Sequence, residues 1–400
     1  MRYVYFLLLA IGFASNGQSQ KTLKLAPGIS LSWHPNIETY FIAERLSVQY
    51  INNYVFTAKD SLYRHQPLVY EAYERFRPYL HTSLVKRIAN LLQYFRDTYH
   101  DNAEVLQYLI AQPAFPARPV NIKFADSVIY RPADHPQTTH NLKELADSLW
   151  SFFRQARVKD FLKRNNFYYE GAMREVRKDI NVEWLKSMEG YYGENFEGYA
   201  MYIMPMMPVT YGEDNYRAFG PVIHTSKGRL AGMFFSSSKM VLSGMQFTKL
   251  KEFGFDNPAV TRLLTVHEFG HSFVNPYVFK SEGTWIKDTV LFTPKWQSIL
   301  EPVYIGNWRT CIIEHLVRTG EIRIALSLND TAEANRLRRI YIETERFVLI
   351  PLLEKKLSEY ESHRDKYPTF ASFLPELLKV FHDLTPKEID GMLSHDLTKP

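Results

Sequence analysis

The sequence lacks several features that would assign the chain to a class at once. It has one cysteine, Cys311, in 400 residues, so no disulfide can form within the chain. Its 48 basic residues only slightly outnumber 43 acidic ones, giving a net charge of +5, and no block of lysine or arginine accompanies the excess. This argues against nucleic-acid binding through phosphate contacts. A fold without disulfides must depend on its core, for which 46% hydrophobic residues at this length are sufficient.

Long hydrophobic runs are also missing, apart from one at the N-terminus. Val4 to Phe13 is almost entirely apolar, follows Arg2, and precedes small residues at positions 14–17. This pattern predicts a signal peptide over residues 1–17 and export to the periplasm or the cell exterior. The run is shorter than the roughly 20 residues that a membrane-spanning helix needs, and no nearby cysteine could carry a lipid. We therefore expect an exported protein without a membrane anchor.

Helical periodicity dominates the first part of the chain. Apolar residues recur at intervals of three and four, which predicts helices over residues 38–48, 67–80, 84–110 and 141–162. Three prolines within residues 112–119 remove backbone donors and predict an extended connector there. We divide the chain into the signal peptide, a helical N-terminal region over residues 18–150, and a second region over residues 151–400 that ends in C-terminal helices.

The pattern changes within the second region. Two β-rich runs, residues 199–204 and 229–236, are separated by glycine, asparagine and proline turns and predict a small mixed sheet. Helical spacing then returns, with helices expected over residues 307–318 and 338–361 and a kink at Pro351. The predicted fold class is α+β and predominantly helical.

One motif in this region points to chemistry. The sequence Val-His-Glu-Phe-Gly-His is an H-E-x-x-H pattern on a predicted helix that is capped by Asn257 and ended by Asn275-Pro276. Side chains four residues apart share a helix face, so His267 and His271 can bind one metal ion while Glu268 lies beside the open position. The other interpretation is a pair of hydrogen-bonded core histidines. In a chain with 13 histidines chance supplies the pattern roughly 0.03 times, so we expect Zn²⁺ binding.

The third metal ligand must come from elsewhere in the chain. The H-E-x-x-H-x-x-G-x-x-H class is excluded, because Val274 and Tyr277 stand where it needs glycine and histidine. We expect Glu314, with Glu301 and Asp288 open as alternatives. Asp288 follows a Gly-Thr pair, but its spacing departs by one residue from a Gly-Thr-x-x-Asp pattern.

Glu314 is favoured by the helix on which it lies. This predicted helix begins after Asn307, stops at Gly320, and has enough apolar residues to be largely buried. It can therefore pack on the motif helix and direct one carboxylate at the metal. Arg318, four residues further on, offers the competing interpretation of an ordinary surface ion pair with Glu314.

Several segments together resemble an uncharacterised bacterial family of exported H-E-x-x-H proteins, the domain of unknown function 4932. The segments that carry the resemblance are residues 267–276, 304–308, 314–318, 360–364 and 367–370. The resemblance spans about residues 30–385, although only the segments after Asn257 are specific. It implies a zincin-like core and a gluzincin, a metallopeptidase that holds zinc with two histidines and one glutamate. The positions His267, Glu268, His271 and Glu314 all match.

This ligand set implies hydrolysis of a peptide bond in a peptide or protein substrate. Zinc lowers the pKa of a bound water to about 7, and Glu268 would take its proton and pass it to the leaving amine. A second donor for the oxyanion could be Tyr304, Tyr277 or His315, of which Tyr304 is our candidate. A substrate strand is expected to pair along Arg229–Ser236, unless this is an interior strand.

A function from another class stays open. A non-catalytic zinc-containing envelope protein could bind peptide, or could bind carbohydrate through aromatic residues such as Tyr191, Tyr192 and Trp285. A structural zinc ion would have its fourth position closed by Cys311 or His315, and the presence of a glutamate in the motif argues against this. The sequence leaves the substrate, the cleavage specificity and the oligomeric state open.

Overall fold

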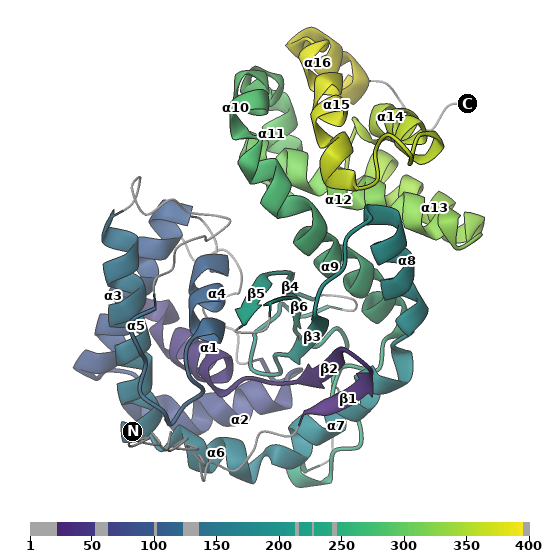
Figure 1. Cartoon of the computed structure of the whole chain (residues 1–400). Coiled ribbons are helices and arrows are strands. Elements are labelled where there is room, and N and C mark those ends of the chain that lie inside the picture. Colours follow the sequence, from purple (N-terminus) through teal and green to yellow (C-terminus); the bar gives the residue numbers. More distant parts are fainter. Residues whose placement is uncertain are drawn as a thin grey trace, which may run out of the picture.

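The computed structural model describes residues 22–52, 63–99, 102–122, 136–212, 216–225, 228–241, 246–303 and 305–394. Within these ranges the chain is mostly helical and contains a small mixed sheet, in agreement with the predicted α+β class (Figure 1). The predicted signal peptide and Tyr304 lie outside the described residues. None of the described helices is long and apolar enough to cross a membrane.

The sheet of the described chain has six strands, four of which were not expected from the sequence. The strands are β1 (Leu23–Ala26), β2 (Ile29–Ser32), β3 (Gly198–Ile203), β4 (Ala218–Phe219), β5 (Val222–Thr225) and β6 (Gly228–Phe235). Their order is β1-β2-β3-β6-β4, with β5 also paired to β6. Strands β2, β3 and β6 run parallel, and the other pairs are antiparallel. The two predicted strands, β3 and β6, are therefore confirmed as the centre of this sheet.

Strand β6 is an interior strand, which overturns the expectation that Arg229–Ser236 forms an open edge. One side of β6 pairs with β3, and the other side pairs with β5 at its start and with β4 at its end. The short strands β4 and β5, which follow one another along this side of β6, thus take the backbone groups that a substrate strand would need. A β-rich run in the sequence does not reveal this, because the covering strands are only two and four residues long.

Eight α-helices of the described chain precede β3. They are α1 (Pro35–Ser47), α2 (Pro67–Phe76), α3 (Ser83–Tyr99), α4 (Ala103–Ala111), α5 (Pro136–Gln155), α6 (Val158–Arg164), α7 (Asn166–Asp179) and α8 (Val182–Tyr192). The expected helix over residues 141–162 is two helices, because Arg157 adopts a left-handed backbone conformation with φ of 56° and separates them. The proline-rich connector is confirmed, since α4 ends at Ala111 and the described residues 112–122 contain no helix.

The helices that follow the sheet in the chain lie together at the end of the molecule opposite the N-terminal helices (Figure 1). They are α9 (Pro258–Lys280), α10 (Glu282–Trp285), α11 (Pro294–Leu300), α12 (Trp308–Ser327), α13 (Thr331–Arg338), the π-helix η6 (Arg339–Thr344), α14 (Ile350–Ser362), α15 (Phe370–His382) and α16 (Pro386–Ser394). The expected single helix over residues 338–361 is wrong. The chain leaves the π-helix before Glu345, and Pro351 lies in the first turn of α14, where its missing N–H costs nothing, rather than at a kink.

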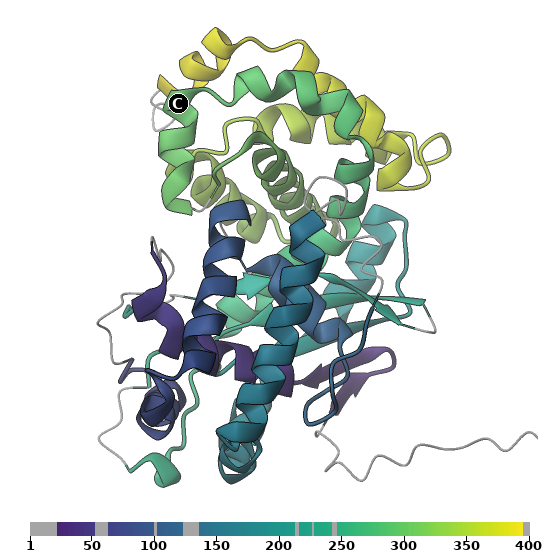
Figure 2. The ribbon, with the colours of Figure 1, turned by 90° about the vertical axis from the view of Figure 1, so that its left-hand side faces the viewer.

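Helix α9 connects the two ends. Its residues Phe269 and Phe273 are buried and contact Tyr199 of β3 and Tyr192 of α8, with ring centroids 5.0 and 4.6 Å apart. The helix also packs against β6 and α12. Figure 1 shows the sheet between the N-terminal helices and the C-terminal helices, with α9 rising from it toward the latter, and Figure 2 shows the C-terminal helices above the sheet. The motif helix is therefore held on both sides by buried contacts.

Candidate metal centre

The helix that carries the H-E-x-x-H motif is α9, and it begins as predicted. The side chain of Asn257 accepts a hydrogen bond from a backbone N–H of the first turn, and Pro258 is the first helical residue. The predicted end at Asn275-Pro276 is wrong, since the helix runs to Lys280. Pro276 removes one backbone donor, but Val278 beyond it is fully buried, and this packing holds the helix together. As a result Asn275 stays on the helix, one turn after His271.

The second helix of the centre is α12, which also begins as predicted and continues further. Asn307 caps it by accepting a hydrogen bond from the N–H of Thr310 at 2.9 Å. The predicted stop at Gly320 is wrong, because α12 runs to Ser327. A side chain at Gly320 would place its Cβ 2.3 Å from the hydroxyl of Tyr192, so the glycine serves close packing against α8. The longer helix keeps Glu321 in line with Glu314.

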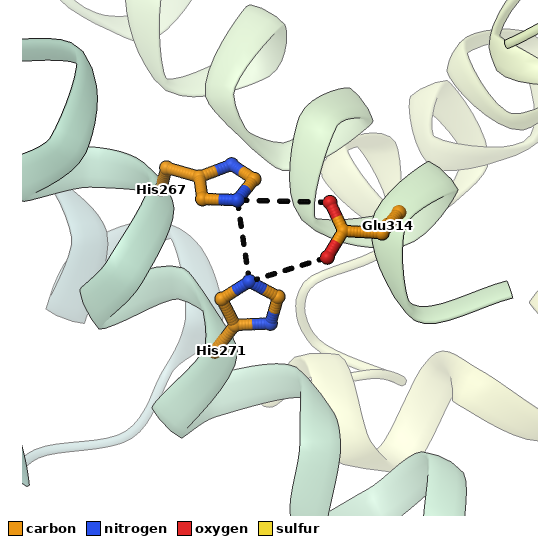
Figure 3. Close-up of side chains that lie close together, drawn as sticks. All are labelled: His267, His271 and Glu314. Carbon is orange, nitrogen blue, oxygen red and sulfur yellow. Dashed lines mark hydrogen bonds and ion pairs between the residues drawn. The ribbon is translucent and has the colours of Figure 1, made fainter. Parts of the chain in front are cut away.

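Three side chains from these two helices converge on one point (Figure 3). Nε2 of His267 lies 3.2 Å from Nε2 of His271 and 3.6 Å from Oε2 of Glu314. Nε2 of His271 lies 3.5 Å from the other carboxylate oxygen, Oε1. The three side chains are 12 to 15% exposed. Ligands of a tetrahedral zinc ion at bond lengths of 2.0 to 2.2 Å are separated by about 3.3 Å, so these distances fit such an ion.

The other ring nitrogen of each histidine is already used. Nδ1 of His267 lies 2.7 Å from Oε1 of Glu321, and Nδ1 of His271 lies 3.1 Å from Oδ1 of Asn275. These oxygens only accept hydrogen bonds, so both Nδ1 atoms carry hydrogen and both Nε2 atoms of the neutral rings present lone pairs. Two lone pairs and a carboxylate then face one another in a buried place. Such a set of acceptors needs a cation between its members, which is either a metal ion or a proton on one ring that the two Nε2 atoms share in a hydrogen bond of 3.2 Å.

The structure separates the three candidates for the third ligand. Among the described residues, Glu314 forms a group with both histidines in which every ligand atom lies within 4.8 Å of the others. Glu301 is exposed on the short helix η5 (Glu301–Val303) and does not belong to this group. Asp288 is buried on η4 (Ile286–Leu291), where it pairs with Nδ1 of His382 at 2.8 Å. Of the three candidates for the third ligand, Glu314 alone is therefore brought to the motif.

The partner of Glu314 on its own helix is not a surface residue. Nε of Arg318 lies 3.5 Å from Oε2 of Glu314, and its Nη1 lies 3.2 Å from Oε2 of Glu345. Its guanidinium group packs over the rings of Tyr341 and Phe347, at 4.6 and 4.5 Å from the ring centroids. The interpretation of an ordinary surface ion pair is therefore wrong, because Arg318 is enclosed by the residues around the centre.

Burial and neighbouring charges act in opposite directions on the pKa values of the site residues. Burial disfavours the charged form of His267, but nearby carboxylates, Glu321 first, raise its pKa to about 9. Burial raises the pKa of Glu268 to about 7. Burial would also raise the pKa of Glu314, but the adjacent histidines His271 and His267 hold it below its usual value. The carboxylates thus favour positive charge where the two imidazoles meet.

Two of the three predicted oxyanion donors lie apart from this group of ligands. The hydroxyl of Tyr277 donates to Oε2 of Glu194 at 2.6 Å. His315 is fully buried, bonds through Nδ1 to the carbonyl oxygen of Cys311 at 2.7 Å, and packs against aromatic rings. His315 is thus a core histidine, and neither it nor Cys311 belongs to the described ligand group. The aromatic residues considered for carbohydrate binding, Tyr191, Tyr192 and Trp285, are buried as well.

Sequence reasoning missed two residues near the centre. Tyr216 lies just before β4, and the charges of Arg318, Glu321, Glu345 and Glu268 act on its hydroxyl, while burial raises its pKa to about 12. The segment that follows it packs closely on α9, since a Cβ at Gly220 would lie 2.0 Å from the carbonyl oxygen of Glu268. Glu321 is the other missed residue. Glu321 follows Glu314 by seven residues, or two helical turns, in the sequence. Because the predicted helix ends at Gly320, the sequence does not place Glu321 on the same helix face.

The fold and the site together define a mostly helical α+β protein with a partly buried His-His-Glu group between two packed helices. A family model, described as Domain of unknown function (DUF4932), matches residues 120–380, and the chain belongs to this family. The matched residues include β3 to β6, α9 and α12, and therefore the whole candidate centre. No curated protein and no solved structure matches the chain.

Proposed function

We propose that this protein is an exported, zinc-dependent peptidase of the gluzincin type, in which His267, His271 and Glu314 hold the metal. One observation carries the proposal. The two Nε2 atoms and the Glu314 carboxylate converge as acceptors at separations of 3.2 to 3.6 Å, while Nδ1 of each histidine is held by another side chain. This arrangement suits a tetrahedral ion with three protein ligands and one open position, which is the arrangement of catalytic zinc sites.

Bound zinc would supply a Lewis acid that polarises the scissile carbonyl and makes water a nucleophile at neutral pH. Glu268 follows His267 directly on α9, and burial raises its pKa to about 7. A carboxylate with this pKa can accept a proton from the attacking water near neutral pH and give it to the leaving amine. Glu268 is therefore proposed as the general base and then the general acid.

The oxyanion of the tetrahedral intermediate needs a hydrogen-bond donor from the chain. Tyr216 supports this role best among the described tyrosines, because its electrostatic partners include Glu268 and Arg318. With its pKa raised to about 12, its hydroxyl keeps its proton at neutral pH and can donate it in a hydrogen bond. Tyr304 lies outside the described residues and stays a candidate from the sequence.

A zincin-like core is part of the proposal. Support comes from the H-E-x-x-H helix α9, which packs against the mixed sheet, and from α12, which supplies a glutamate from a second helix. The proposal of export depends on the predicted signal peptide. The expected partner is a peptide or protein substrate, and we expect neither nucleic-acid binding nor a membrane anchor. A non-catalytic zinc-containing protein of the cell envelope that binds peptide or carbohydrate is the alternative.

The test is digestion of a mixed peptide library at neutral pH by the purified mature protein, with and without a zinc chelator. We expect cleavage that the chelator abolishes and that added Zn²⁺ restores. Absence of cleavage over a broad library by a zinc-loaded protein would favour the non-catalytic alternative. Cleavage that resists removal of zinc would exclude the metallopeptidase.

A further inference from the structure

His267 is held from both of its ring nitrogens by carboxylates of one helix. Glu314 lies near Nε2, and Glu321, seven residues later on α12, lies 2.7 Å from Nδ1. Glu321 is buried, and its second oxygen accepts a hydrogen bond of 2.6 Å from the hydroxyl of Tyr341. Tyr341 is buried too and lies on the π-helix η6. A chain of two hydrogen bonds thus connects η6 to the imidazole.

A second connection runs from the same segment to Glu314. Glu345 directly follows η6 and pairs with Nη1 of Arg318 at 3.2 Å. Nε of Arg318 lies 3.5 Å from Oε2 of Glu314. The guanidinium group is also held between the rings of Tyr341 and Phe347. Residues 339–347, which we call the clamp segment, therefore reach one histidine and the glutamate of the metal centre by separate routes.

The clamp segment contains a π-helical turn, and this turn places the side chains that make these contacts. The chain changes from the α-helix α13 to a π-helix for residues 339–344 and then ends the helix, so that Phe347 N–H bonds to the carbonyl oxygen of Tyr341 at 2.8 Å. A π-helical turn is rare, and it frequently occurs at functional sites. Here it places Tyr341 and Glu345, which are four residues apart, toward Glu321 and Arg318, respectively.

We propose that the clamp segment is the positioning element of the metal centre. Tyr341 acts through Glu321 to fix the tautomer and orientation of His267, and Glu345 acts through Arg318 to fix the carboxylate of Glu314. A carboxylate that accepts the second N–H of a ligating histidine raises the basicity of the ring and typically contributes 10- to 100-fold in metal affinity. This inference rests on the proposed function, because it requires that the His-His-Glu group holds a metal.

The experiment measures zinc affinity by competition with a chromophoric chelator, using the mature protein and the variants Glu321→Gln, Tyr341→Phe and Glu345→Gln. Tyr360→Phe is the matched control, because Tyr360 is a fully buried tyrosine whose hydroxyl donates to the carbonyl oxygen of Tyr191 at 2.6 Å, away from the clamp segment. Thermal unfolding of the zinc-free proteins reports the structural cost of each substitution. The visible spectrum of the Co²⁺-loaded proteins reports the ligand geometry.

We expect zinc affinity to fall about 10- to 100-fold in Glu321→Gln and several-fold in Tyr341→Phe and Glu345→Gln, with altered Co²⁺ spectra. Tyr360→Phe should lose thermal stability as Tyr341→Phe does, yet keep the affinity and the spectrum of the wild type. If all variants bind zinc and Co²⁺ as the wild type does, the clamp role is wrong and the metal centre stands. If the wild type binds no zinc, the proposed function fails and the inference with it.

Discussion

Glu314 and Glu321 lie two turns apart on one side of α12, and both contact His267, the first 3.6 Å from Nε2 and the second 2.7 Å from Nδ1. Two carboxylates of the same helix thus serve different purposes at one imidazole. Glu314 lies on the side of the ring where the Nε2 atoms of His267 and His271 meet. Glu321 lies at the opposite ring nitrogen and itself accepts a hydrogen bond from the hydroxyl of Tyr341. Glu314 thus belongs to the proposed metal ligands, and Glu321 to the residues proposed to position them.

Glu268→Gln should fold and keep its zinc, but lose at least about a thousandfold in turnover, because the amide keeps the shape of the side chain and cannot accept a proton. Turnover is measured on a peptide selected from the library, and zinc is measured in the same samples. Glu301→Gln is the control, because this exposed glutamate lies on η5, outside the ligand group. Equal turnover by Glu268→Gln and the wild type would rule out the general base.

Tyr216→Phe should lower kcat/KM about 100-fold without loss of zinc, because it removes a proposed oxyanion donor and leaves the ligands in place. Tyr211→Phe, an exposed tyrosine of the same part of the chain, is the control and should behave as the wild type. The comparison uses steady-state kinetics with one peptide. If Tyr216→Phe retains full activity, the donor lies elsewhere, and Tyr304 becomes the first residue to test.

A pH-dependent stability is expected from Glu38 of α1. This fully buried carboxyl accepts hydrogen bonds from the hydroxyl of Tyr169 and the N–H of Met206, and burial raises its pKa to about 8. The folded protein therefore keeps the proton up to about pH 8, whereas the unfolded chain releases it near pH 4.5. The stabilisation is complete below pH 4.5 and is lost as the pH rises to about 8.

Glu38→Gln lacks this titration, so the free energy of unfolding of the variant should improve relative to the wild type as the pH rises from 5 to 8. Urea unfolding of both zinc-free proteins at several pH values measures the difference. A difference between the two proteins that does not change over this range would show that Glu38 does not titrate as its burial implies.

The close packing of α8 on α12 gives a prediction for stability. Gly320→Ala should destabilise the protein by about 1 to 3 kcal/mol, because the new Cβ would lie 2.3 Å from the Tyr192 hydroxyl in a packed interior. Removing that oxygen by Tyr192→Phe should recover part of the loss in the double variant. Additive effects of the two substitutions in denaturant unfolding would exclude this contact as the cause.

The grouping of His267, His271 and Glu314 could be predicted because each of the two helices that carry these residues has a clear local pattern. The spacing of four between His267 and His271 defines one helix face, and the apolar residues around Glu314 mark a helix that must pack against something. The helix ends could not be predicted at Pro276 and Gly320, since both residues are strong local stop signals. Buried contacts made by distant segments, such as Tyr192 against Gly320, override those signals.

Other parts depend on contacts between distant segments that no local pattern records. Strands β1 and β2 are four residues each and were missed, although β2 pairs with β3 more than 160 residues later. The segment that begins at Tyr216 lies beside α9 because Gly220, between β4 and β5, packs against the backbone of Glu268. The interior position of β6 has the same origin, since the strands that cover it are too short to show alternation.

The most direct test of the central claim is the zinc content of the purified mature protein, measured by elemental analysis beside Glu314→Ala, Glu301→Ala and Asp288→Ala. The His-His-Glu centre requires about one zinc per chain in the wild type, in Glu301→Ala and in Asp288→Ala, and loss of zinc in Glu314→Ala, because removal of one of three protein ligands greatly weakens the site. Full zinc occupancy in Glu314→Ala, or no zinc in the wild type after incubation with Zn²⁺, would contradict the account.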